Sequence, residues 1–89
     1  MTITYHSKFK KDIQKINDKK LKKALLDKIQ ELKNCSNIEE VPGIKKLKGH
    51  STAYRMRIGN SRLGFFAEET ETLLLQRSVI RNDIYKLFP

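Results

Sequence analysis

The sequence predicts an α+β fold: a twisted, mainly antiparallel sheet with an N-terminal helical hairpin packed on one face and a short C-terminal helical turn. Two observations predict it. Apolar residues recur at helical spacing between residues 7 and 33, and they alternate with polar residues after residue 53. Short turn sequences separate the alternating segments, as in antiparallel sheets. The expected order is β-α-α-β-β-β, in a single domain spanning residues 1–89.

The first part of the chain predicts one strand and two amphipathic helices. Thr2–Tyr5 is short, alternating and β-prone, which favours an edge or near-edge strand. Ser7 is a candidate N-cap for the first helix, which ends at Asn17 and Asp18. The second helix is expected over about residues 19–33, with charged residues opposite its apolar stripe. The apolar positions are Phe9, Ile13 and Ile16 in the first helix and Leu21, Ala24, Leu25, Ile29 and Leu32 in the second.

A β-hairpin is expected in the second half of the chain. Residues 54–58 alternate, so Arg55 and Arg57 lie on the open face of a half-buried strand. The Gly-Asn pair at residues 59–60 stands where a tight hairpin turn is needed, and residues 62–67 form the return strand.

Irregular segments separate the remaining elements. Residues 34–43 are expected to form a loop, and residues 68–71 a second turn. A third long strand is expected at residues 72–80, and residues 82–89 form the last helical turn. In that third strand we expect one face to hold Leu73, Leu75 and Val79.

The charge is large and unevenly distributed. Nineteen Lys and Arg residues against ten Asp and Glu residues give a net charge of +9. All five arginines lie between residues 55 and 81, whereas thirteen of the fourteen lysines lie between residues 8 and 48. Lysine is a strongly hydrated point charge, and arginine is a planar fork suited to phosphate and base recognition. The charge therefore favours a polyanionic partner, recognised by the arginine-rich part of the chain.

The composition favours a cytoplasmic protein without a membrane segment. The longest apolar run, Leu73–Leu75, is far shorter than the roughly 18 residues that cross a bilayer. The N-terminus lacks the charged and then apolar layout of a secretion signal. The single cysteine, Cys35, excludes an internal disulfide and fits a reducing compartment.

Five side chains form the candidate site. Arg55 and Arg57 share one side of a strand, about 6.5–7 Å apart. Arg62 follows the two-residue turn, so we expect it opposite Arg57 or its neighbour. Arg81 ends the last strand, and Tyr85 follows one helical turn later. Several guanidiniums can neutralise the charge on a phosphodiester during cleavage, and a phenol can stack on a base or transfer a proton.

No metal or other cofactor is expected. His6 and His50 are isolated, the carboxylates are scattered, and the ligand pairs H-x-x-x-H and C-x-x-C do not occur. A ribonuclease without a metal would use the 2′-hydroxyl of the RNA as its nucleophile. Such an enzyme would not cut DNA, which lacks that group.

Three stretches of the chain carry a family resemblance. Residues 44–49 (IKKLKG), 54–66 (YRMRIGNSRLGFF) and 81–89 (RNDIYKLFP) resemble the RelE/ParE superfamily of type II toxins, and more closely its RelE branch of mRNA interferases. The opening strand and the lysine-rich helical hairpin are also similar to that family. The resemblance therefore covers essentially the whole chain.

The resemblance implies a cytosolic toxin that a cognate antitoxin holds inactive. RelE-like members enter the A site of the ribosome and cut mRNA there by 2′-hydroxyl attack. An antitoxin segment, disordered when free, is expected to fold across the helical hairpin and the sheet edge. The positions that match the family's site are Arg55, Arg57, Arg62, Arg81 and Tyr85, and the lysines expected to bind RNA are Lys45, Lys46 and Lys48.

The sequence departs from the family pattern at the proton-accepting positions. RelE has lysines in the basic pair, whereas Arg57 here is a poor base because a guanidinium hardly ever deprotonates. Many relatives have histidine where this chain has Ile80. A tyrosine of many relatives is Ser61 here, a change expected to affect packing more than chemistry. The candidates for the base are Tyr85, His50 and Lys48.

Other functions fit the same pattern. A ParE-like toxin that poisons DNA gyrase and cleaves nothing would share this fold, and so would an inactive relic that only binds an antitoxin. The site residues also admit structural roles. Arg55 and Arg57 could form a solvated strand face, Arg62 could pair with Glu68 or Glu69, and Tyr85 could pack with Leu87 and Phe88.

Overall fold

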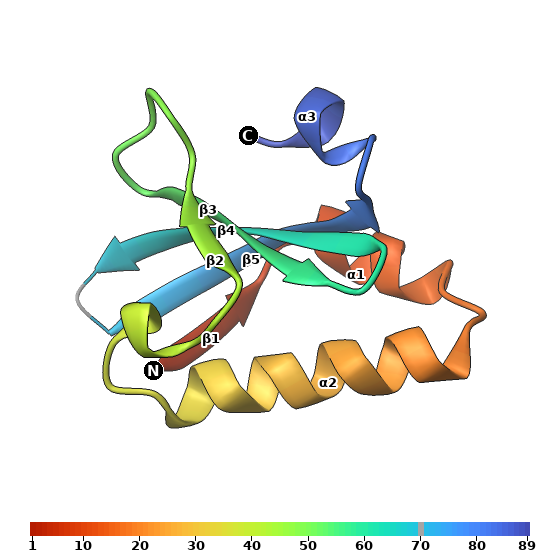
Figure 1. The fold of residues 1–89 in the computed structure, drawn as a ribbon, viewed down its shortest axis with the longest axis horizontal. Coiled ribbons are helices and arrows are strands. Elements are labelled where there is room, and N and C mark those ends of the chain that lie inside the picture. Colours follow the sequence, from red (N-terminus) through yellow and green to blue (C-terminus); the bar gives the residue numbers. More distant parts are fainter. Residues whose placement is uncertain (70) are drawn as a thin grey trace.

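The computed structural model describes residues 1–69 and 71–89 and confirms the α+β fold (Figure 1). The elements are β1 (Thr2–Tyr5), α1 (Ser7–Gln14), α2 (Lys19–Asn34), a 3₁₀ turn (Ile38–Glu40), β2 (Ile44–Lys46), β3 (Ala53–Ile58), β4 (Ser61–Glu69), β5 (Thr72–Ile80) and α3 (Ile84–Leu87). Within the described ranges, no helix is long and apolar enough to cross a membrane.

Five strands form one sheet in the order β1-β5-β4-β3-β2. β1 lies at one edge, as expected, and runs parallel to β5, whereas the other neighbours are antiparallel. β2 forms the opposite edge and was not expected, because three residues are too few to show an alternation. Of the turn expected at residues 68–71, Glu68 and Glu69 belong to β4, and residue 70 lies outside the described ranges.

The turn between β3 and β4 has the predicted two residues. Ile58 pairs directly with Ser61, which leaves Gly59 and Asn60 as the loop. Gly59 has a φ of +57°, whereas Asn60 does not have a positive φ. A positive φ at the first loop position alone is the pattern of a type II′ turn, which matches the twist of the strands it joins. This turn fixes the register of the hairpin.

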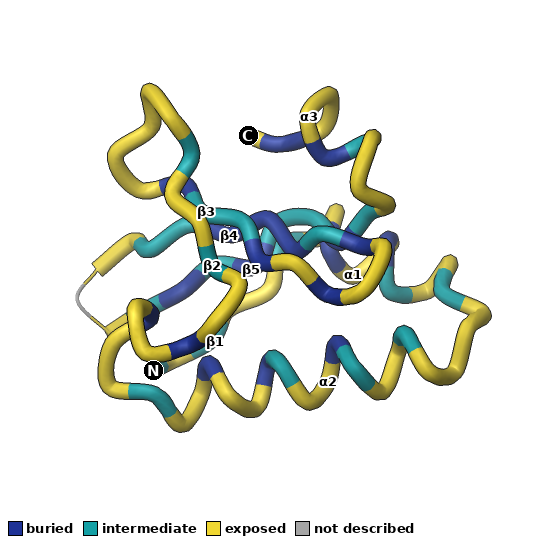
Figure 2. The backbone as a smooth tube through the Cα atoms, in the orientation of Figure 1, coloured by how far each residue is buried: buried dark blue, intermediate teal, exposed yellow. Residues whose placement is uncertain are grey.

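The core lies between the two N-terminal helices and one face of the sheet. Figure 2 shows that the buried positions of α2 point toward the sheet. The buried side chains of this core are Phe9 from α1, Leu25, Ile29 and Leu32 from α2, Ile38 and Val41 from the loop, and Met56, Ile58, Leu63, Phe65, Leu73 and Leu75 from the sheet. We call this the helix face of the sheet, and its opposite the outer face.

The helices begin at polar residues that accept backbone hydrogen bonds. The N-cap of α1 is His6, whose Nδ1 accepts from the backbone N–H of Lys8 at 3.0 Å. The expectation of a Ser7 cap was therefore wrong by one residue, because an imidazole nitrogen can accept the same bond as a hydroxyl. Asp18 caps α2 by accepting from the backbone N–H of Lys20 and Leu21.

An irregularity in β5 changes which residues face the helices. Phe65 pairs with Leu75 but Gly64 pairs with Arg77, so Gln76 is an extra residue opposite β4. The extra residue reverses the alternation beyond it. Leu75 lies in the core under the helices, whereas Val79 packs on the outer face against α3. The expectation that Val79 faces the same way as Leu73 and Leu75 was therefore wrong.

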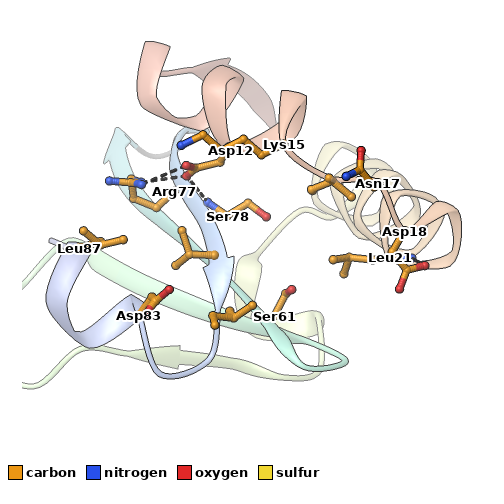
Figure 3. Close-up of a pocket in the computed structure, with 13 residues that line it drawn as sticks. Asp12, Lys15, Asn17, Asp18, Leu21, Ser61, Arg77, Ser78, Asp83 and Leu87 are labelled. Carbon is orange, nitrogen blue, oxygen red and sulfur yellow. Dashed lines mark hydrogen bonds and ion pairs between the residues drawn. The ribbon is translucent and has the colours of Figure 1, made fainter.

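Asp12 of α1 fastens this helix to the part of β5 that has no neighbouring strand. β1 pairs only with residues 72–75 of β5. Beyond that point, the Asp12 carboxylate accepts from the backbone N–H of Ser78 at 2.9 Å. It also accepts from Nε and Nη2 of Arg77, at 2.8 and 3.0 Å (Figure 3). Asp12 is only 6% exposed, and these three bonds satisfy its charge.

We predict that Asp12→Ala lowers the free energy of unfolding by about 3 kcal/mol, because it leaves the Arg77 charge and the Ser78 N–H without their partner. Urea denaturation measures the change. The matched control is Glu31→Gln, which removes the exposed Lys28–Glu31 pair of α2 and should cost less than about 0.5 kcal/mol. Equal effects of the two substitutions would contradict the role assigned to Asp12.

Candidate functional site

The arginines of the first hairpin lie on the outer face of the sheet. Arg57 is directly opposite Arg62, as expected from the two-residue turn. Arg55 is directly opposite Gly64. Directly opposite residues share a face, and residues two apart on a strand do so as well. Arg55, Arg57 and Arg62 therefore project from one face, away from the helix core.

α3 lies on the same outer face (Figure 1), and its Tyr85 contacts Arg55. Its anchors are Ile84 and Phe88, which form a second apolar cluster with Ala53 of β3. Tyr85 stands between the two anchors and is 69% exposed. Nη1 of Arg55 donates a hydrogen bond to the Tyr85 hydroxyl, and the Arg55 Cζ lies 5.0 Å from the centre of the ring. Tyr85 is thus a partner of Arg55 and not a buried packing residue.

The arginines of this surface have no carboxylate partner in the described part of the chain. The ion pairs among those residues are Lys28–Glu31 and Arg77–Asp12. Arg62 does not pair with Glu68 or Glu69. Its Nη1 donates to the carbonyl oxygens of Gly59 and Ser61, at 3.2 and 2.8 Å. We call the surface formed by Arg55, Arg57, Arg62, Arg81 and Tyr85 the arginine face.

The charges of the arginine face act on one another. The pKa of Arg62 is lowered by partial burial first, and then by the positive charges of Arg57, Arg81 and Arg55. A guanidinium stays charged nonetheless, so the effect of the cluster is mutual repulsion. The charges of Arg55, Arg57 and Arg81 act on Arg62, and these four cations have no counter-ion among the described residues, so the arginine face is a candidate site for an anion.

The same cluster favours the deprotonated form of Tyr85. The hydrogen bond from Arg55 lowers the pKa of the Tyr85 phenol most strongly, followed by the charge of Arg55. The charges of Arg62 and Arg81 lower this pKa further, whereas burial opposes the shift. The arginine face therefore combines a group of unpaired arginines with a phenol whose pKa is lowered.

The three lysines expected to bind RNA lie in different settings. Lys45 of β2 is directly opposite Arg55, so it extends the arginine face to the sheet edge. Lys46 is opposite Tyr54 and belongs to the other face. Lys48 is exposed in the loop between β2 and β3, together with His50. Neither of these two side chains makes a hydrogen bond to another of the described residues.

Arg77, left out of the expected site, contributes to the fold through Asp12. Sequence reasoning missed the close contact between Gly64 and the ring of Phe88. The available signal was a glycine inside an otherwise apolar strand, which often marks the close approach of another group. Ser61, by contrast, is buried opposite Ile58 on the helix face, away from the arginines. Across residues 1–69 and 71–89, His, Cys, Asp and Glu side chains do not gather in groups of three that could hold a metal.

Comparison with known proteins extends over the full length of the chain. No protein-family model matches it. The toxin RelE3 of Methanocaldococcus jannaschii is 30% identical over 90 residues, which cover all of both proteins.

Two solved structures of RelE–RelB complexes resemble this chain. The RelB-RelE antitoxin-toxin complex from Methanococcus jannaschii matches with a TM-score of 0.80 and 29% identity, over 97% of this chain and 99% of the other. The RelE-RelB complex from Pyrococcus horikoshii matches with a TM-score of 0.70 and 21% identity, over 90% and 93% of the two chains. At 21% identity, the similarity to the Pyrococcus horikoshii complex shows the fold alone. Together with the full-length likeness to RelE3, these matches show that the chain belongs to the RelE family of toxins.

Proposed function

We propose that this chain is the toxin of a toxin–antitoxin pair and acts as an endoribonuclease that cleaves mRNA in the A site of the ribosome. One observation carries the proposal. Arg55, Arg57 and Arg62 share the outer face with α3, and the charges of Arg55, Arg62 and Arg81 act on Tyr85, without a carboxylate partner for these arginines among the described residues. Such a cluster costs stability unless an anion fills it, and a nucleic-acid phosphate is the anion that the family resemblance suggests.

The proposed reaction uses only groups of the RNA and the arginine face. The 2′-oxygen attacks the adjacent phosphorus, and the bond to the 5′-oxygen of the next nucleotide breaks. A base takes the proton of the 2′-hydroxyl, and the leaving 5′-oxygen gains a proton. The products are a 2′,3′-cyclic phosphate and a 5′-hydroxyl. Charge builds on the phosphoryl oxygens during the attack, and the guanidiniums stabilise it there.

Tyr85 is the best candidate for the base in this reaction. Its hydrogen bond with Arg55 and the surrounding positive charge lower the pKa of the phenol, which raises the fraction of phenolate at a given pH. The other two candidates, Lys48 and His50, lie in the loop between β2 and β3, where they have no hydrogen bond to the described site residues. Arg57 stays protonated and serves as a phosphate ligand.

An apolar groove between α1 and α2 supports the antitoxin part of the proposal. Its floor holds Phe9, Ile13 and Ile29, and its volume is about 610 Å³. Leu26 lines the groove and is 59% exposed, which is unusual for a large apolar residue on a helix. Lysines stand at the rim. We infer that an amphipathic antitoxin segment, apolar on one side and acidic at its borders, fills this groove.

Arg81→Ala and Tyr85→Phe should each reduce cleavage of ribosome-bound mRNA by about a hundredfold or more, because they remove a charge stabiliser and the base. Primer extension on a reporter mRNA in a reconstituted translation reaction measures the cuts, with and without ribosomes. Lys86→Ala is the matched control, since Lys86 is an exposed cation next to Tyr85 on α3. Intact mRNA in a reaction that still translates would overturn the nuclease proposal, and DNA gyrase supercoiling would then test the alternative.

The cleavage rate should rise with pH as Tyr85 loses its proton, with the midpoint below the ordinary tyrosine value of 10. Arg55→Gln removes the positive charge that contributes most to the shift, so its midpoint should move upward toward that value. Single-turnover rates across a pH series measure both midpoints. An unchanged midpoint in the Arg55 variant would exclude Tyr85 as the titrating base.

Leu26→Asn should weaken antitoxin binding about tenfold, because it replaces an exposed apolar side chain that lines the groove with a polar group. Calorimetric titration with the cognate antitoxin measures the affinity. Asp27→Asn is the control, since Asp27 is exposed on the same helix and does not line the groove. Cleavage by the free toxin should be the same in both variants. Equal affinities would mean that the antitoxin binds elsewhere.

A further inference from the structure

We propose that Gly64 and Phe88 are positioning residues for Tyr85: the missing side chain of Gly64 makes a seat on the sheet for the Phe88 ring, and that seat sets the position of the phenol. We call this contact the Phe88 seat. Its consequence for cleavage rests on the proposed function, but its effect on the Tyr85 phenol does not.

Space, and not backbone conformation, explains the glycine at position 64. A Cβ at this position would lie 2.6 Å from Cγ of Phe88, and 2.7 and 2.9 Å from the two Cδ atoms. These distances are shorter than any tolerated carbon–carbon contact. The glycines with a positive φ are Gly43, Gly49 and Gly59, so Gly64 has a backbone that other residues adopt readily. A glycine inside a strand is otherwise unfavourable, which points to the close approach of the ring as its reason.

The Phe88 ring is held firmly in this seat. Phe88 is 4% exposed, and its ring lies 5.0 Å from the ring of Phe66, at an angle of 52°. Gly64 pairs with Arg55 on one side and Arg77 on the other. The ring therefore occupies the gap that Gly64 leaves in a row of cationic residues across the outer face.

The seat determines where α3 lies, because α3 is too short to hold itself. A four-residue helix is not stable alone, so its position depends on what it packs against. Its two buried anchors are Ile84 and Phe88, and the backbone N–H of Phe88 closes the turn by bonding to the carbonyl of Ile84 at 3.0 Å. Tyr85 lies within this turn and is largely exposed, so burial of its own ring contributes little to its position.

The link from the seat to the chemistry runs through Arg55. Arg55 is the residue directly opposite Gly64, and it donates the hydrogen bond to the Tyr85 hydroxyl. If Phe88 leaves the seat, the phenol moves relative to the strand that carries Arg55. Loss of that bond removes the strongest influence on the pKa of Tyr85. Groups that bind the phosphate, such as Arg57 and Arg62, stay on their strands.

The test compares Gly64→Ala, Phe88→Ala and the double variant. Ultraviolet titration of tyrosinate, with the Tyr85→Phe protein subtracted, gives the midpoint of Tyr85 in each full-length toxin. Single-turnover cleavage of ribosome-bound mRNA gives the rate constant and the apparent affinity. Leu87→Ala is the control, because Leu87 is a partly exposed α3 residue outside the seat. Far-ultraviolet circular dichroism and antitoxin binding confirm that each variant is folded.

In both single variants the Tyr85 midpoint should move up toward its ordinary value, and the cleavage rate should fall about a hundredfold with an unchanged apparent affinity. Gly64→Ala should add nothing in the Phe88→Ala background, because the ring that it displaces is gone. Leu87→Ala should behave like the parent protein.

A Tyr85 midpoint that stays unchanged in folded Gly64→Ala would overturn the proposal, and so would additive effects of the two substitutions. Failure of the proposed function looks different. In that case the parent toxin leaves mRNA intact. The Tyr85 midpoint still rises in Gly64→Ala and in Phe88→Ala, and the double variant shows no larger rise than Phe88→Ala alone.

Discussion

The hydrogen bonds along the two edges of β5 hold this molecule together. On one edge β5 pairs with β4 over nearly its whole length, and on the other it pairs with β1 for four residues. Where β1 ends, the Asp12 carboxylate replaces a strand by accepting from Ser78. α3 then packs over Val79 on the outer face. β5 therefore contacts β1, β4, α1 and α3, and Asp12 supplies its hydrogen bonds to α1.

Stabilising apolar contacts and mutually repelling charges lie on opposite faces of the sheet. The helix face buries the apolar core, whose side chains do not depend on the charges of the outer face. The outer face holds four arginines that repel one another, three of them on paired strands that cannot drift apart. The pairing of β3 with β4 sets the backbone positions of Arg55, Arg57 and Arg62. α3 adds the phenol to this surface through two apolar anchors.

Much of the fold and most of the candidate surface could be predicted from the sequence. Alternation along residues 54–58 and the Gly-Asn turn were enough to bring Arg55, Arg57 and Arg62 to one face, because strand geometry is local. The reversal at Gln76 could not be predicted, since a bulge leaves no periodic signal. The glycine at position 64 indicated a close approach, but the approaching group could not be predicted, because Gly64 and Phe88 are far apart in the sequence. The features that the sequence did not predict depend on contacts between segments that are distant in the chain.

The parallel pairing of β1 with β5 also constrains how the protein folds during its synthesis. Residues 2–5 pair with residues 72–75, so about seventy residues separate the partners. Loops of this length close slowly, and contacts of high sequence separation slow folding. During synthesis the N-terminal strand must wait for β5 to emerge, and both Arg81 and Tyr85 follow β5 in the chain. A nascent chain therefore cannot complete its arginine face until nearly all of this sequence has left the ribosomal exit tunnel.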